Sequence, residues 1–154
     1  MKSSTLTAIT HLKQRGGNNM ESKFTVPGVP VGKGRPRFTR QGHAYTPEKT
    51  AAYEEKVRLC WKTQSGQGFA GGVPIRATIN GYFPIPQSLS KKRRAAMIGT
   101  PHTKKCDADN LAKTILDSIN GLAYVDDSAV CELVVTKNYC DVPRVEVFLE
   151  AIGE

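Results

Sequence analysis

The segment from residue 107 to residue 121 constrains the fold more than any other part of the chain. Leu111, Ile115 and Ile119 recur every four residues, which is the spacing of one apolar face of an α-helix. Asn120-Gly121 follows directly and is typical of the residues that end a helix. A helix with one apolar face has to bury that face against another layer, so this segment predicts a helix that packs by this stripe.

Alternation of apolar and polar residues predicts strands elsewhere in the chain. The clearest is 75–83, and shorter ones are expected at 24–26, 131–136 and 145–149. Asp141-Val142-Pro143 reads as a turn that joins the last two strands into an antiparallel hairpin.

Two more helices are expected. One begins with Thr46 as N-cap and Pro47 in the first position, and a short one opens at Ser88-Leu89-Ser90. The predicted fold class is therefore α+β: a small mixed or antiparallel sheet with helices packed on one side. Residues 1–21 are interpreted as a disordered leader and residues 22–154 as one domain.

Charge is distributed unevenly along the chain. Its 22 Lys and Arg exceed its 14 Asp and Glu, for a formal net charge of +8. Residues 1–100 carry 17 basic and 4 acidic residues, whereas residues 101–154 carry 5 and 10. Basic surface attracts a polyanion, and carboxylates beside it would oppose that binding unless they hold cations.

Several protein classes are excluded. No uncharged apolar run approaches the roughly 20 residues that cross a bilayer, and the first residues lack the apolar block of a secretory signal. The four cysteines form no Cys-x-x-Cys pair, so we expect free thiols in a reducing cytoplasm. A zinc site can be drawn from His102, Cys106, Cys131 and Cys140, but its spacings match no standard finger.

The acidic residues of the last third gather around the predicted helix. Asp107 and Asp109 lie at its start, and Asp126-Asp127 follows a tight return that is expected to come back beside that start. Carboxylate oxygens are the ligands that Mg²⁺ or Mn²⁺ takes, and an ion held there assists hydrolysis of a phosphodiester. Lys113 lies one turn after Asp109 and could contact the scissile phosphate. The alternative is that these acids only cap the helix and offset its dipole.

The pattern Asp107-x-Asp109-Asn110-Leu111-x-Lys113-x-x-x-Asp117, followed by Asn120-Gly121 and Asp126-Asp127, resembles the signature of the RusA family of Holliday junction resolvases. The upstream Gly32–Arg37 and Tyr45-Thr46-Pro47 resemble phage or prophage members. The resemblance implies a homodimeric, Mg²⁺- or Mn²⁺-dependent endodeoxyribonuclease that makes paired symmetric nicks across a four-way junction in recombination and repair. It assigns catalysis to Asp107, Asp109, Asp127 and Lys113, and metal binding to Asp107, Asp109, Asp126 and Asp127.

The basic residues are the candidate DNA contacts of a cytoplasmic, nucleoid-associated protein. Phosphate contacts are assigned to these side chains: Lys33, Arg35, Arg37, Arg40, Lys104 and Lys105. Phe38 either stacks on bases that open at a crossover or is buried in the core. A short basic run at 91–94 either grips a duplex arm or is only solvated.

Two other functions remain open at this point. One is a basic DNA-binding module of a phage or prophage that does not cleave. The other is a phosphatase or phosphotransferase with an Asp-x-Asp nucleophile. The polar residues before Asp107 disfavour it, because such a motif normally follows a buried hydrophobic strand.

Overall fold

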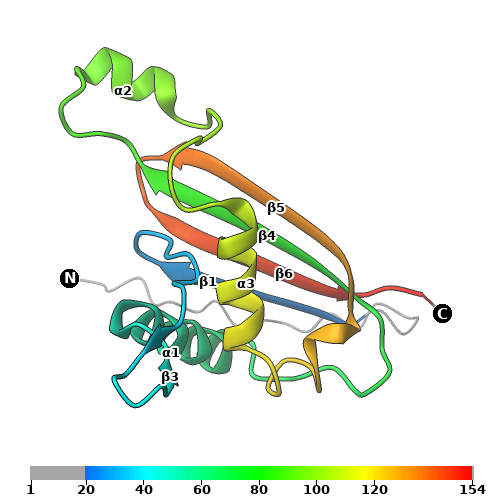
Figure 1. The fold of residues 1–154 in the computed structure, drawn as a ribbon. Coiled ribbons are helices and arrows are strands. Elements are labelled where there is room, and N and C mark those ends of the chain that lie inside the picture. Colours follow the sequence, from blue (N-terminus) through cyan, green and yellow to red (C-terminus); the bar gives the residue numbers. More distant parts are fainter. Residues whose placement is uncertain (1–19, 154) are drawn as a thin grey trace, which may run out of the picture.

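The computed structural model describes residues 20–153, which form one mixed sheet with helices on one side (Figure 1). The sheet order is β1-β6-β4-β5, with β4 and β5 parallel and the other neighbours antiparallel. Its strands are β1 (Glu21–Pro27), β4 (Ile75–Pro84), β5 (Val130–Cys140) and β6 (Arg144–Ala151). The predicted α+β class and the mixed sheet are confirmed. No helix of the described part is long and apolar enough to cross a membrane.

Within residues 20–153, three α-helices and one 3-10 turn complete the fold. They are α1 (Glu48–Gln64), α2 (Lys91–Met97), α3 (Ala108–Ser118) and η1 (Asp127–Ala129). Two short strands, β2 (Arg37–Phe38) and β3 (Ala44–Tyr45), pair as a separate hairpin. Ser90 caps α2 through the backbone N–H of Arg93, as its sequence predicts. Thr46 is not the N-cap of α1, because that position is taken by Pro47.

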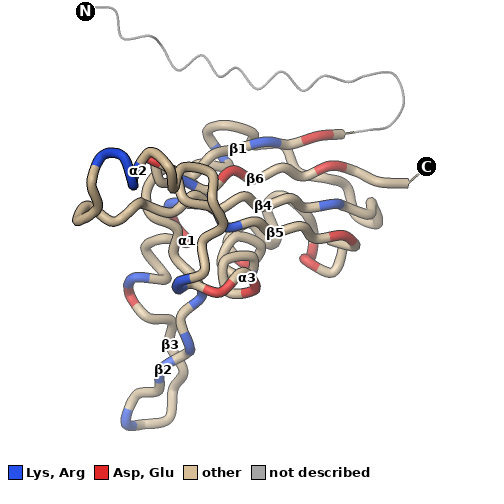
Figure 2. The backbone as a smooth tube through the Cα atoms, turned by 90° about the horizontal axis from the view of Figure 1, so that it is seen from above, with Lys and Arg blue, Asp and Glu red and all other residues tan. Residues whose placement is uncertain are grey.

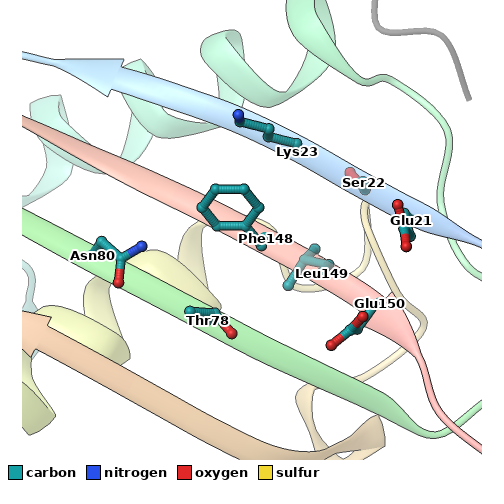
Figure 3. Close-up of a pocket in the computed structure, with 8 residues that line it drawn as sticks. All are labelled: Glu21, Ser22, Lys23, Thr78, Asn80, Phe148, Leu149 and Glu150. Atoms are coloured by element: carbon teal, nitrogen blue, oxygen red, sulfur yellow. The ribbon is translucent and has the colours of Figure 1, made fainter.

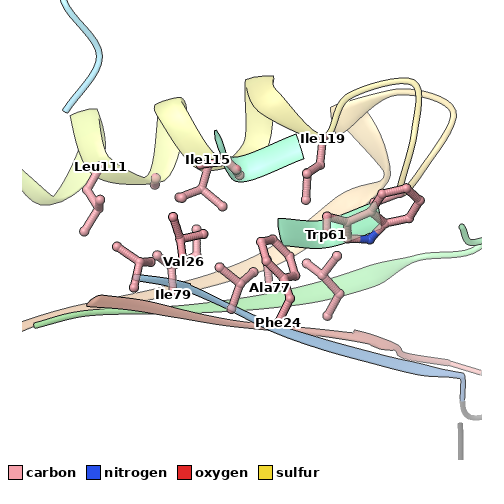
Figure 4. Close-up of a cluster of buried hydrophobic side chains, with 14 of the residues drawn as sticks. Phe24, Val26, Trp61, Ala77, Ile79, Leu111, Ile115 and Ile119 are labelled. Atoms are coloured by element: carbon pink, nitrogen blue, oxygen red, sulfur yellow. The ribbon is translucent and has the colours of Figure 1, made fainter. Parts of the chain in front are cut away.

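The core lies between the sheet and the two long helices. The predicted stripe of α3, Leu111, Ile115 and Ile119, is fully buried on the inward side chains of the sheet (Figure 4). Gly81 of β4 allows this close approach, since a Cβ there would come within 2.7 Å of Leu111. α1 covers the β1 side with Val57 and Trp61. The stripe fixes which face of α3 remains exposed.

The predicted C-terminal hairpin is wrong. β5 and β6 do not pair with each other, because β4 lies between them and pairs with both. The chain leaves β4, passes through α2 and α3, and enters β5 in the same direction as β4. The fully apolar inner side of β4 makes it a central strand, which alternation within 131–149 alone could not reveal.

The predicted leader falls mostly on residues 1–19, which lie outside the described residues. β1 begins at Glu21, the last residue assigned to that leader.

Candidate active site

The exposed face of α3 carries three of the predicted site residues. Asp107 is the N-cap of the helix and its side chain makes no capping hydrogen bond. Asp109 and Lys113 are exposed one turn apart, and Asp117 is half-buried one turn further on. This face is exposed to solvent because the opposite, apolar face of α3 is buried in the core. These charges lie on the side of α3 away from its buried apolar stripe.

The second acidic pair lies at the other end of α3. Tyr124 donates its hydroxyl hydrogen bond to the Leu116 carbonyl at 2.7 Å, and it also bridges to Asn120. Burial and then the charges of Asp127, Asp117 and Asp126 raise the pKa of Tyr124. The expectation that Asp126-Asp127 returns beside the helix start is therefore wrong. The segment that carries Asp126 and Asp127 is instead held against the last turn of α3.

The two acidic groups are separated by the length of the helix. A rise of about 1.5 Å per residue places Asp107 and Asp117 about 15 Å apart along α3. Within residues 20–153, no three His, Cys, Asp or Glu side chains converge closely enough to hold a metal ion. One chain by itself therefore does not assemble the predicted ligand set.

The donor chemistry of both groups nevertheless suits a hard divalent cation. None of the ion pairs in the described part of the chain uses Asp107, Asp109, Asp126 or Asp127. Hydrogen bonds from Ser128, first from its side chain and then from its backbone N–H, lower the pKa of the Asp126 carboxyl group. Carboxylates that no Lys or Arg neutralises are available to Mg²⁺ or Mn²⁺.

The zinc alternative is not supported. The four cysteines are free thiols, and Cys131 lies exposed on the sheet edge. The His102 ring stacks on Phe83 at a centroid distance of 3.9 Å and meets the edge of Tyr139 at 4.8 Å. Burial, and then the positive charges of Lys137 and Lys104, lower the pKa of His102. This histidine is a packing residue.

Lys33 lies against the acidic face of α3. Its backbone N–H donates to the Asn110 carbonyl at 3.1 Å. Its ammonium group pairs with Glu54 at 2.5 Å and with Asp117 at 3.2 Å. Burial alone would lower the pKa of Lys33, but the hydrogen bonds and charges of both carboxylates outweigh it and raise the pKa. Lys33 thus ties its segment to α1 and α3, and its ammonium group is not free for a phosphate in this arrangement.

Gly32 permits this contact between the segment and α3. A Cβ at that position would lie 2.6 Å from the Cys106 Cβ and 3.3 Å from the Asn110 Cβ. Real Cβ atoms essentially never approach as closely as the first distance. The glycine before Lys33 is thereby explained by close packing at the start of α3.

The hairpin of β2 and β3 projects from the body of the protein and carries the other predicted cations of this segment (Figure 2). Arg35, Arg37 and Arg40 are all exposed. Phe38 is 70% exposed and Tyr45 is 47% exposed. Burial of Phe38 in the core, one of the two readings left open, is excluded.

A second group of cations surrounds the start of α3. Lys104 and Lys105 are exposed just before Asp107. Lys137 of β5 donates from its ammonium group to the Lys104 carbonyl at 2.7 Å. No sequence pattern groups Lys137 with Lys104 and Lys105, because only the fold brings β5 beside this segment. α2 holds a further basic cluster, and none of its residues is buried.

A hollow of about 390 Å³ opens on the side of the sheet that the helices do not cover (Figure 3). Its lining residues come from β1, β4 and β6: Glu21, Ser22, Lys23, Thr78, Asn80, Phe148, Leu149 and Glu150. None of the predicted site residues is among them. The candidate site is therefore the exposed side of α3 and not this hollow.

Comparison with known proteins gives two matches. The family model described as endodeoxyribonuclease RusA matches residues 27–150. A Bacillus subtilis (strain 168) protein described as uncharacterized protein YqaN is 38% identical over 138 residues. That alignment covers 85% of this chain and 96% of the relative. The matched region includes both acidic groups, α3 and the basic hairpin.

Proposed function

Because the chain belongs to the RusA family of endodeoxyribonucleases, we propose that it is a divalent-metal-dependent endonuclease that resolves four-way DNA junctions by paired nicks. The proposed process is DNA recombination and repair. The proposed location is the cytoplasm, at the nucleoid, and the proposed enzyme is of the prophage type. The observation that carries this proposal is the pair of acidic groups at the two ends of the exposed face of α3, none of them neutralised by an ion pair in the described residues.

The separation of these groups supports a site shared between two copies of the chain. In a dimer with two-fold symmetry, the two α3 helices can face each other in opposite directions. The partner's Asp126 and the partner's Asp127 would then lie beside Asp107 and Asp109 of the first copy. Each dimer would have two such sites, which matches the two-fold symmetry of a four-way junction. The proposed enzyme is therefore a homodimer.

In such a site, Asp107 and Asp109 with the partner's Asp127 would hold Mg²⁺, for which Mn²⁺ could substitute, and Asp126 is a further candidate ligand. A divalent ion bound there would increase the acidity of a water molecule and offset the charge that builds on the phosphate. Lys113 extends from the same face one turn after Asp109, where an ammonium group can orient a phosphate oxygen. Lys104 and Lys105 would bind the phosphates on either side.

The proposed activity predicts metal-dependent nicking of a synthetic four-way junction. With Mg²⁺ present, we expect symmetric nicks on strands of like polarity and release of nicked duplexes. Chelation should abolish the nicks but leave the complex visible by gel shift, because phosphate contacts do not need the ion. Binding without nicking in either Mg²⁺ or Mn²⁺ would instead identify a non-catalytic DNA-binding module. Linear duplex, flap and fork substrates of equal length serve as controls.

The hairpin of β2 and β3 is expected to supply phosphate contacts. Replacing Arg37 and Arg40 together by Ala should weaken junction binding and reduce the slope of log affinity against log salt by about 2, since each phosphate contact contributes roughly one released counterion. The slope is measured by fluorescence anisotropy between low and moderate salt. Replacing half-buried Arg58 of α1 or exposed Arg93 of α2 by Ala in single variants tests the other basic surfaces for comparison. An unchanged slope in the double variant would remove the hairpin from the interface.

A further inference from the structure

The short helix α2 stands away from the packed body of the protein, beyond the end of β4 (Figure 1). None of its side chains is buried, so packing does not explain its sequence. The segments on its two sides are fixed to the sheet. Ile85 is buried directly after β4, and the Gly99 N–H and the Thr100 carbonyl bond to the backbone of Tyr139 of β5 at 2.8 and 2.9 Å. α2 is therefore a projection that its two ends hold in place.

The cations of α2 point away from the protein. At about 100° per residue, the five fully exposed residues of the helix lie within an arc of about 200°. They are Lys91, Lys92, Arg93, Ala95 and Ala96. The two half-buried residues, Arg94 and Met97, fall in the remaining arc, which faces the rest of the chain. The outer side of α2 thus presents three cations with only alanine methyl groups between them.

No neighbouring acid neutralises these cations. Residues 84–106 contain six Lys and Arg and no Asp or Glu. No ion pair within residues 20–153 includes a cation of α2. The charges also weaken the helix itself, because cations in a first turn oppose the helix dipole and Lys91 lies one turn from Arg94, which has the same charge. Neither packing nor helix stability explains this basic surface, and its charge is complementary to a polyanion.

From these observations we infer that the outer side of α2 binds the phosphate backbone of a duplex arm, outside the candidate active site. The inference rests on the proposed function, which supplies branched DNA as the ligand. Contacts to phosphates read no base sequence, so this surface adds affinity and orients the arm. The contact is separate from the one expected of the hairpin of β2 and β3, which projects from another side of α3 (Figure 2).

The chain connects this surface directly to the candidate active site. The ten residues from 98 to 107 span at most about 35 Å when fully extended, which is about one helical turn of B-DNA. Lys104 and Lys105 lie exposed on this connection, and Lys137 is bonded to it. A duplex arm that leaves a phosphate near Asp107 can therefore reach α2 within one turn and pass basic side chains on the way.

The first test removes two outer charges of α2. In a double variant, Lys92→Gln with Arg93→Gln, the slope of log affinity against log salt should become shallower by about 2, since each phosphate contact accounts for roughly one released counterion. Glutamine has a helix propensity similar to that of Lys and Arg, and circular dichroism checks the fold. Junction binding is measured by fluorescence anisotropy in EDTA, so that no strand is nicked. A wild-type slope in the double variant would overturn the inference.

The matched control removes one Lys and one Arg at the other end of the sheet. Arg58 and Lys62 lie in the second half of α1, whose end is fixed to the start of β1 by a 2.5 Å hydrogen bond between the hydroxyl groups of Ser65 and Ser22. β1 begins beside the start of β4, whereas α2 follows the end of β4. Arg58→Gln with Lys62→Gln should keep the wild-type slope. An equal change in this control would assign the effect to net charge and overturn the inference.

The second test distinguishes a duplex arm from the crossover. The α2 double variant should lose the same factor of affinity for a four-way junction and for a linear duplex with the sequence of one arm. The ratio of the two affinities should therefore equal that of the wild type. A loss confined to the junction would place α2 at the crossover and contradict the inference.

The outcomes separate this inference from the nuclease proposal. A wild-type protein that nicks junctions, together with an unchanged salt slope in the α2 double variant, would keep the function and reject the α2 contact. A shallower slope in that variant, together with a wild-type protein that nicks no junction in Mg²⁺ or Mn²⁺, would keep the α2 contact and reject the function.

Discussion

Asp109→Asn is expected to abolish junction cleavage while leaving junction binding intact or tighter. The substitution removes one carboxylate from the proposed metal ligands and retains the shape of the side chain. Loss of groups that merely support a metal ligand costs about 10–100-fold, so loss of a ligand should lower the nicking rate by at least about a hundredfold. Binding should not weaken, because a negative charge near the DNA phosphates is removed. Single-turnover nicking and gel shift measure the two effects separately.

The control for this prediction is Asp141→Asn, which makes the same change of charge in the turn between β5 and β6. Asp141 is exposed, and its carboxylate accepts a hydrogen bond from the Cys140 thiol at 3.2 Å. Its nicking rate should remain near that of the wild type. If Asp109→Asn lost binding together with cleavage, Asp109 would be a structural or DNA-binding residue and its assignment as a metal ligand would fail.

Local sequence patterns predicted the elements that meet the core on one face. The four-residue stripe of α3 and the alternation of β4 both report directly which side chains are buried, and both are confirmed. The start of α2 at Ser90 also depends only on neighbouring residues, because this serine caps the helix through the backbone N–H of Arg93. The polar face of α3 followed without further information, because a helix that buries Leu111 and Ile115 must expose Asp109 and Lys113.

Pairing between distant segments could not be read in the same way. β5 and β6 alternate as hairpin strands do, yet β4 enters between them because its inner side is buried along its whole length. The position of Asp126-Asp127 depended on Tyr124, whose hydroxyl reaches back to Leu116 and holds the turn at the end of α3. Neither contact has a signature in the spacing of the acidic residues.

The exposure of Phe38 could not be predicted from the sequence either. Phe38 is flanked by arginines in a segment that Gly34 and Pro36 keep out of a helix, and buried Phe is the common case. The short β2 and β3 strands extend from the body, so Phe38 has no core to enter. Its exposure beside three arginines favours the reading in which it contacts opened bases.

Mixing two inactive variants is expected to restore nicking if each site is shared between copies. Asp109→Asn and Asp127→Asn should each be inactive as homodimers. In their heterodimer, one site receives both substitutions and the other receives neither, so one intact site remains. Random refolding of equal amounts makes about half of the dimers mixed, which corresponds to about a quarter of the wild-type number of sites. Because the intact site acts alone, the product should be a singly nicked junction and not two resolved duplexes.

The matched control mixes Asp109→Asn with Asp107→Asn. Both residues lie at the start of α3, so a shared site would receive one substitution in each half of the heterodimer and no activity should return. If nicking activity returned in the first mixture and not in the second, the site would be shared between two copies. Activity regained merely through refolding would return in both mixtures. If the first mixture also stayed inactive, all four aspartates would have to act within one chain. The turn at Tyr124 would then have to leave the end of α3 and move about 15 Å toward Asp107 on binding DNA, against the packing that buries the Tyr124 ring.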